Sequence, residues 1–193
     1  EGLAQVDFLT SENLWSLRER PERLVVLGGG PIGTELAQAF ARLGSSVSQV
    51  EMQPRVMMRE DPEISTAVMD SLRADGVEVL VEHTALRVHV DADGAKVLTV
   101  SGPDGERELV FDEILVAVGR SANVSGFGLE ALGVNLTTGG TVAVDEYLTT
   151  NFPNIYAVGD VAGPYQFTHT ASHMAWYAAV NALFGTFWRF RVD

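Results

Sequence analysis

The feature that most constrains the fold is a glycine-rich run, residues 28–33, which directly follows the apolar stretch 24–27. A strand that ends in such a turn and continues into a helix is typical of dinucleotide-binding βαβ units. There the first glycine permits the sharp turn, the second lets the pyrophosphate approach the backbone, and the third lets the helix pack on the strand. Gly28, Gly30 and Gly33 have the spacing for these roles.

A helix is expected immediately after the loop. Ile32, Leu36, Phe40 and Leu43 recur at near-helical spacing until Gly44 interrupts the pattern. Pro31 suits the first helical turn, and the amides behind it would point at the phosphates together with the positive end of the helix dipole. The loop and the helix start are therefore predicted to bind a dinucleotide, with a purely structural turn as the alternative.

An acidic residue stands where such a site needs one. Glu51 follows the second predicted strand, residues 47–50, and lies 18 positions after Gly33. Its carboxylate can accept both hydroxyls of the adenine ribose and would repel a 2′-phosphate, which favours NAD over NADP. Arg55 and Arg59 follow closely and could clamp such a phosphate, so NADP stays open as the alternative.

The rest of the chain changes its periodicity twice. A helix capped by Asp61 should run to Gly76, and a third strand is expected at 77–81. The further predicted strands are 86–90, 97–100, 108–111, 114–118, 141–144 and 155–158, followed by an apolar helix over 168–183. The fold class is thus α/β, a Rossmann-like parallel sheet with an antiparallel meander. The expected divisions are a connecting segment at 1–20, a nucleotide-binding domain at 21–118 and a second segment at 119–193.

Composition narrows the partners. With 13 basic and 26 acidic residues, the net charge of −13 disfavours nucleic acid and anionic lipid surfaces. There is no cysteine, which excludes disulfides, thiolate metal sites and cysteine nucleophiles within these residues, and no metal site is expected. No apolar run approaches the roughly 20 residues of a membrane-spanning helix, so we expect a cytoplasmic protein.

Three ordered stretches resemble signatures of a known family. Residues 28–35 (GGGPIGTE), 117–123 (AVGRSAN) and 154–160 (NIYAVGD) are similar, in that order, to motifs of the pyridine nucleotide-disulfide oxidoreductases. This is the flavoprotein family of dihydrolipoamide dehydrogenase, glutathione reductase and mercuric reductase. Residues 36–45 and 59–62 look most like the mercuric reductase branch.

The resemblance implies roles for individual residues. Gly159 and Asp160 would place a carboxylate on the ribityl chain of FAD, and Gly119 with Arg120 would belong to the cofactor-binding surface. Amides near His169, Thr170 and Ala171 would stabilise negative charge on the reduced flavin. His169 is more simply explained as a residue that hydrogen-bonds at a helix start than as a catalyst, and no catalytic residue is assigned.

The resemblance also implies a role for Glu35 and for segments outside the chain. Glu35 would pair with a lysine near the flavin, or else it simply favours the helix dipole. Family members begin with a first FAD-binding unit and a redox-active cysteine pair, and they end with a dimer-forming domain. The resemblance thus implies that residues 119–193 are the second, C-terminal half of a discontinuous FAD-binding domain. We therefore expect an internal fragment of a homodimeric enzyme that passes hydride from NAD(P)H to FAD and on to a disulfide or another acceptor. The fragment alone should be inactive.

Two other functions fit the glycine loop. One is a non-enzymatic module that senses NAD, and the other is a self-contained dehydrogenase. The second lacks a convincing acid-base group in the sequence.

Overall fold

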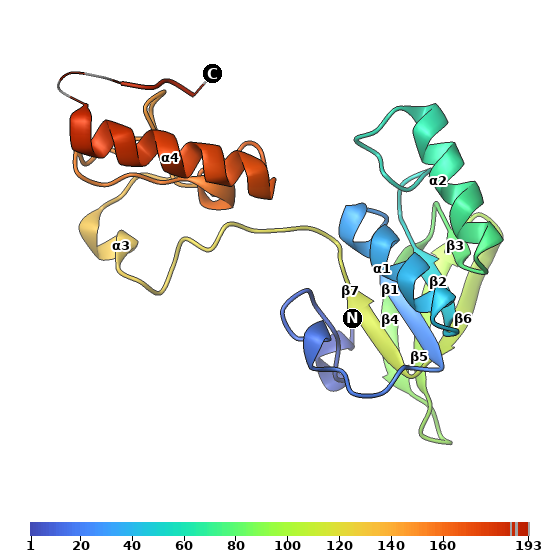
Figure 1. The fold of residues 1–193 in the computed structure, drawn as a ribbon. Coiled ribbons are helices and arrows are strands. Elements are labelled where there is room, and N and C mark those ends of the chain that lie inside the picture. Colours follow the sequence, from blue (N-terminus) through green and yellow to red (C-terminus); the bar gives the residue numbers. More distant parts are fainter. Residues whose placement is uncertain (186, 188, 193) are drawn as a thin grey trace. The chain divides into compact units, whose positions relative to one another are not determined.

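The structure is a computed structural model that describes residues 1–185, 187 and 189–192. The chain divides into two compact units, Glu1–Gly119 and Arg120–Asp193. Figure 1 shows the first unit from blue to yellow and the second from yellow to red. Each unit has its own hydrophobic core, and each is described separately below.

A parallel sheet forms the centre of the first unit, with strand order β3-β2-β1-β7. Its strands and their two connecting helices are β1 (Arg23–Leu27), α1 (Pro31–Arg42), β2 (Ser46–Val50), α2 (Pro62–Ala74), β3 (Glu78–Leu80) and β7 (Glu113–Val116). The antiparallel meander consists of β4 (Thr84–Val90), β5 (Lys96–Gly102) and β6 (Gly105–Phe111). The predicted α/β class with a parallel sheet and an antiparallel meander is confirmed.

Alternate side chains of β1 pack against two different layers of the first unit. Leu24 and Val26 pack in the cluster that includes residues of α1 and α2, whereas Val25 and Leu27 pack in the cluster that includes the meander. Successive side chains of a strand point to opposite faces, so β1 is apolar on both sides because both sides are covered. The parallel sheet therefore lies between a helical layer and the meander (Figure 1).

Both predicted helices of the first unit are present, and both have proline in their first turn. Asp61 occupies the N-cap position of α2, as predicted, but its side chain makes no capping hydrogen bond. Its backbone carbonyl instead accepts the first helical bond, from Ser65 N at 3.0 Å. The helix start is thus stabilised through the backbone and the proline, and the predicted N-cap position of Asp61 is confirmed.

The N-terminal segment is packed within the first unit. It holds two short 3-10 turns, Leu3–Gln5 and Leu14–Ser16. Leu9 forms a parallel bridge with Leu115 of β7 and is only 8% exposed. Residues before β1 therefore extend the edge of the central sheet.

The second unit is built around α4 (Thr168–Phe184), with a short helix α3 (Leu129–Leu132) and a 3-10 turn at Gly159–Val161. Asn181 is a buried polar residue of α4. Its side chain donates to the carbonyl oxygens of Tyr147 and Phe190 and accepts from Phe190 N, at 2.8–3.0 Å. These bonds fasten two loop segments onto the helix.

The strands predicted at 141–144 and 155–158 were wrong. Each of these segments contains only a single β-bridge, Leu136 with Val142 and Thr149 with Tyr156. Between them the carboxylate of Asp145 accepts the N–H groups of Tyr147 and Thr149, both at 2.9 Å. This turn bends the backbone away from a continuous ladder. In the described part of the chain, no helix is long and apolar enough to cross a membrane.

Candidate functional site

The glycine loop lies between β1 and α1 and is closely packed at Gly29, where a Cβ would lie 2.9 Å from the Glu51 side chain, and against backbone at two further glycines. A Cβ at Gly28, whose φ is +106°, would clash with the carbonyl oxygen of Ala117. A Cβ at Gly33 would clash with the carbonyl oxygen of Gly28. Strand, turn and helix can approach this closely only because both residues lack a side chain.

Gly30 has a different environment, because a Cβ there would meet no heavy atom within 4 Å. The first hydrogen bond of α1 runs from Thr34 N to Gly30 O at 2.9 Å. The amides of Ile32 and Gly33 therefore precede the hydrogen-bonded ladder of the helix, and Pro31 has no N–H. The first turn carries no acidic side chain. Open space, unbonded helix-start amides and a positive dipole end together suit a phosphate.

Glu51 lies directly beside the loop. One carboxylate oxygen accepts from Gly29 N at 2.6 Å, and the other accepts from Gln53 N at 2.8 Å. The side chain is thus fixed at the carboxyl end of β2, where sequence analysis expects it to meet a ribose.

The two nearby arginines differ in their availability. Arg55 donates to the carbonyl oxygens of Glu60 at 2.7 Å and Met58 at 3.3 Å. Arg59 is exposed. The guanidinium of Arg55 is therefore occupied in closing its own loop.

Two residues whose side chains contact the loop backbone, Gln49 and Thr34, were not predicted from the sequence. Gln49 is fully buried on β2, and its Nε2 donates to Gly28 O at 3.0 Å and to Thr34 Oγ1 at 3.2 Å. Thr34 Oγ1 in turn donates to Gly29 O at 3.3 Å. A long polar side chain on the same strand face as Val47 was the signal that could have identified Gln49.

Two further predicted residues are less defined by their contacts. Glu35 is exposed on α1 and forms no ion pair with the residues that the structure describes. Gly119 has a φ of +153° and open space at its Cβ position. Neither is brought into contact with the glycine loop by an observed hydrogen bond.

The second unit brings together Arg120 and Asp160, which are 40 residues apart in sequence. Arg120 Nη1 lies 3.1 Å from Asp160 Oδ2, and both side chains are about half exposed. The pair orients the carboxylate and occupies one of its oxygens.

The start of α4 lies against the turn that carries Asp160. A Cβ at Gly159 would lie 3.1 Å from the Cβ of Ala171, so the turn and the helix are closely packed. Ala171 N already donates to Phe167 O at 2.9 Å. The amides that precede the helical ladder are therefore those of Thr168, His169 and Thr170. Ala171 contributes packing instead of an amide donor.

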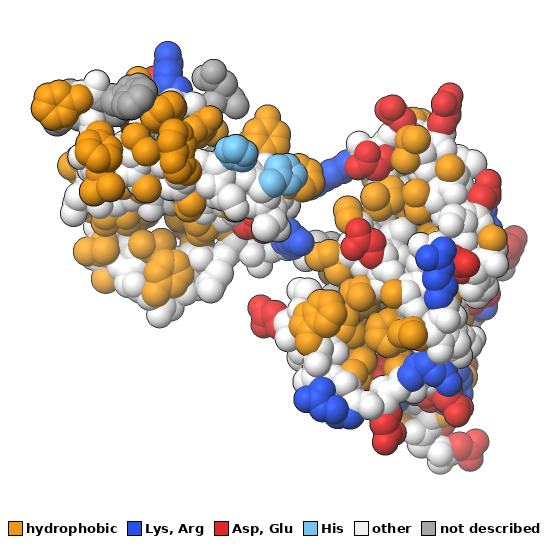
Figure 2. All heavy atoms as spheres, in the orientation of Figure 1, with side chains coloured by type: hydrophobic (Ala, Val, Ile, Leu, Met, Phe, Trp, Pro, Cys, Tyr) orange, Lys and Arg blue, Asp and Glu red, His pale blue; other side chains and the backbone are white. Residues whose placement is uncertain are grey.

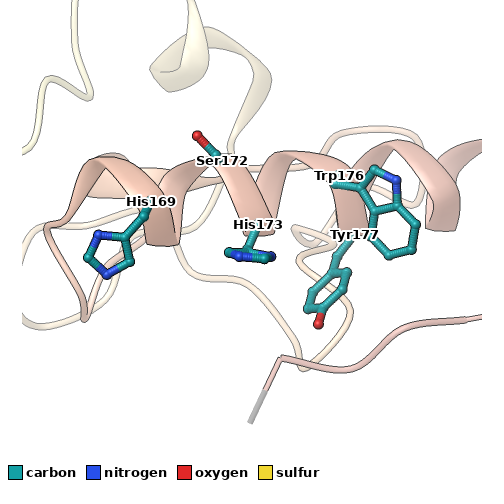
Figure 3. Close-up of a pocket in the computed structure, with 5 residues that line it drawn as sticks. All are labelled: His169, Ser172, His173, Trp176 and Tyr177. Carbon is teal, nitrogen blue, oxygen red and sulfur yellow. The ribbon is translucent and has the colours of Figure 1, made fainter.

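A shallow hollow runs along α4, lined by His169, Ser172, His173, Trp176 and Tyr177. Figure 3 shows both histidines and Tyr177 on one side of the helix, with Ser172 pointing away from them. The His169 ring stacks on Phe167 with 5.5 Å between centroids. Among the described residues, no group of three or more metal-ligating side chains could hold an ion.

Comparison with known proteins agrees with this geometry. A family model described as pyridine nucleotide-disulphide oxidoreductase matches residues 1–175. Mercuric reductase of Streptomyces lividans is 42% identical over 187 residues, and dihydrolipoyl dehydrogenase of Chlamydia trachomatis is 35% identical over 173 residues. The structure of the HOCl-induced flavoprotein disulfide reductase RclA from Escherichia coli superposes with a TM-score of 0.86 at 29% identity.

These matches cover nearly all of this chain but less than half of each relative. The mercuric reductase alignment includes 96% of this chain and 39% of the relative, and the dihydrolipoyl dehydrogenase alignment 90% and 36%. The RclA superposition covers 98% of this chain and 42% of that protein. The family resemblance inferred from three motifs is confirmed: the chain belongs to the pyridine nucleotide-disulphide oxidoreductase family.

Proposed function

We propose that the unit Glu1–Gly119 binds NAD(P)H, with NADH preferred, as the electron-donor portion of a longer FAD-dependent oxidoreductase. The observation that carries this proposal is the combination of open space at Gly30 with the amides of Ile32 and Gly33 at the start of α1. A pyrophosphate would fill that space and accept hydrogen bonds from those amides.

The preference for NADH follows from Glu51 and Arg55. The carboxylate of Glu51 is fixed by Gly29 N and would oppose a 2′-phosphate. Arg55, which could have neutralised such a phosphate, is bound to two backbone carbonyls. Accepting NADPH would therefore require Arg59 alone to compensate for a fixed negative charge.

The unit Arg120–Asp193 would contribute to the FAD site. When bound in the longer protein, FAD would accept the hydride and pass electrons to a disulfide or another acceptor. Asp160, oriented by Arg120, would hold a ribityl hydroxyl through its second oxygen. The amides of Thr168 to Thr170 would favour negative charge on the group placed before α4.

Calorimetric titration of the 193-residue chain with NADH and NADPH tests the proposal. We expect micromolar binding of NADH and at least about tenfold weaker binding of NADPH. Glu51→Gln is the sharpest variant, because it removes the charge while its amide oxygen can still accept from Gly29 N, although the hydrogen bond from Gln53 N is lost. In this variant the affinities for NADH and NADPH should be closer to each other than in the unchanged chain.

The matched control is Glu108→Gln, which removes an exposed acid of β6 in the meander and should leave the ratio of the two affinities unchanged. Absence of NADH binding to the folded chain would contradict the proposal. Tighter binding of NADPH than NADH would contradict its coenzyme preference.

A further inference from the structure

Gln49 is an unusual residue for its position. It lies on β2 between Ser48 and Val50, is 0% exposed, and faces the helical side of the sheet together with Val47. Its Oε1 has no hydrogen-bond partner among the described residues. A buried polar oxygen without a partner lowers stability, and this cost offsets part of what hydrogen bonds from the same side chain contribute.

The nitrogen of the Gln49 amide contacts the glycine loop from the core of the protein. Nε2 donates to Gly28 O at 3.0 Å and to Thr34 Oγ1 at 3.2 Å. Thr34 Oγ1 then reaches Gly29 O at 3.3 Å, and this same carbonyl also accepts from Met57 N at 2.7 Å. The carbonyls of two consecutive glycines are thereby held from within the protein.

Three glycines in succession have more conformational freedom than any other tripeptide, and a ligand must restrict that freedom when it binds. Gly30 is the glycine with open space, and it follows directly after the two whose carbonyls are held. Because Gly28 and Gly29 are already fixed, the loop loses less conformational entropy when a ligand binds. This mechanism raises coenzyme affinity without any contact between Gln49 and the coenzyme.

We infer that Gln49, acting with Thr34, is a positioning residue that pre-organises the phosphate-binding loop for the dinucleotide. This inference rests on the proposed function, because it assigns the loop to coenzyme phosphates. It accounts for a buried amide that the hydrophobic core does not need.

The test compares two substitutions in the 193-residue chain. Gln49→Leu removes the unpartnered Oε1 together with the two Nε2 hydrogen bonds, so the thermal unfolding temperature should change by only a few degrees, about 5 °C at most, while NADH binding should weaken about tenfold. A residue that served only folding would change the unfolding temperature and leave the NADH affinity of the folded chain unchanged. Amide hydrogen exchange at Gly29 should become at least about tenfold faster in this variant.

Thr99→Val is the matched control. Thr99 is a second buried polar residue, 1% exposed, whose Oγ1 has no partner among the described residues, but it lies on β5 in the meander. Its replacement should leave both NADH affinity and exchange at Gly29 unchanged. If Gln49→Leu does not fold, Thr34→Val removes the hydroxyl from the same network and should give the same loss of affinity.

The outcomes separate this inference from the proposed function. If Gln49→Leu binds NADH within about twofold of the unchanged chain and exchange at Gly29 stays constant, the inference is overturned. If the unchanged chain does not bind NADH, the proposed function fails. The rate of amide hydrogen exchange at Gly29 then decides by itself whether Gln49 positions the loop. Faster exchange in Gln49→Leu would then support loop positioning, and equal exchange would overturn it.

Discussion

Gly30 and Gly33 belong to one sequence motif, but their surroundings differ. Those of Gly30 suit a ligand, and those of Gly33 serve the packing of the fold. Gly30 faces open space and has an extended backbone, φ −75° and ψ 177°, that alanine can adopt. Gly33 lies against the carbonyl oxygen of Gly28. A methyl group at the first position would occupy ligand space, whereas at the second it would push strand and helix apart.

We therefore predict that the two alanine variants differ in stability, although both lose NADH affinity. Gly30→Ala should change the free energy of unfolding by less than about 1 kcal/mol while weakening NADH binding more than about tenfold. Gly33→Ala should cost about 1–3 kcal/mol of stability as well as affinity. Chemical denaturation together with calorimetric titration measures both. Equal affinity in Gly30→Ala and the unchanged chain would argue against a ligand in that space.

At the scale of elements, β1 is tied to β7 by an ion pair at their beginnings. Asp112, which directly precedes β7, accepts from Arg23 N at 2.7 Å and pairs with the Arg23 guanidinium. The hydrogen bond from that guanidinium lowers the pKa of the Asp112 carboxyl below its usual value. The charged form is therefore favoured by folding.

The sign of the pH effect follows from this direction. Because the pKa of Asp112 is lower in the folded state, its stabilisation is complete above the unfolded value near 4 and is lost as pH falls through the folded value. Asp112→Asn should lower the unfolding temperature by about 2 °C at pH 7, a modest effect because solvent screens the pair. The difference between variant and unchanged chain should shrink below about pH 4.

Asp70→Asn serves as the control for this experiment. Asp70 and Arg73 lie 3.7 Å apart on the exposed face of α2, with 69% and 51% of their side chains accessible. Such a pair contributes little, so the unfolding temperature should not change. A pH-independent loss in Asp112→Asn would show that packing, not the carboxylate charge, is responsible.

At the scale of the whole molecule, the two units present different surfaces. Figure 2 shows acidic side chains over the first unit and hydrophobic side chains gathered over α4 in the second. Large exposed apolar residues of α4 are Trp176, Leu183 and Phe184. A helix that is apolar around much of its circumference is typical of the interior of a larger protein.

We accordingly predict that the 193-residue chain binds NADH but neither retains FAD through gel filtration nor oxidises NADH when FAD is supplied. The chain spans 36–42% of the relatives described above, and under the proposed function its second unit would supply only part of a flavin site. Absorbance of the eluted protein near the flavin bands and loss of NADH absorbance measure the two properties. A yellow chain that turns over would contradict the prediction.

Much of the fold was predictable because its signals are local. The glycine spacing, the helical repeat from Ile32 to Leu43 and the turns of the meander depend on residues a few positions apart. The strands expected at 141–144 and 155–158 failed for the converse reason. A strand needs a continuous partner, and apolar composition cannot show that the Asp145 turn redirects the chain.

The sequence by itself determined that a strand, a glycine turn and a helix follow one another, and that an acidic residue ends the next strand. Only the tertiary structure decided which glycine leaves room for a ligand, that Arg55 is bound to its own loop, and that Gln49 supports the glycine turn. These properties depend on contacts between residues distant in sequence, such as Gln49 with Gly28 and Arg120 with Asp160. Such contacts form only when the chain has packed, because each partner is placed by a different element.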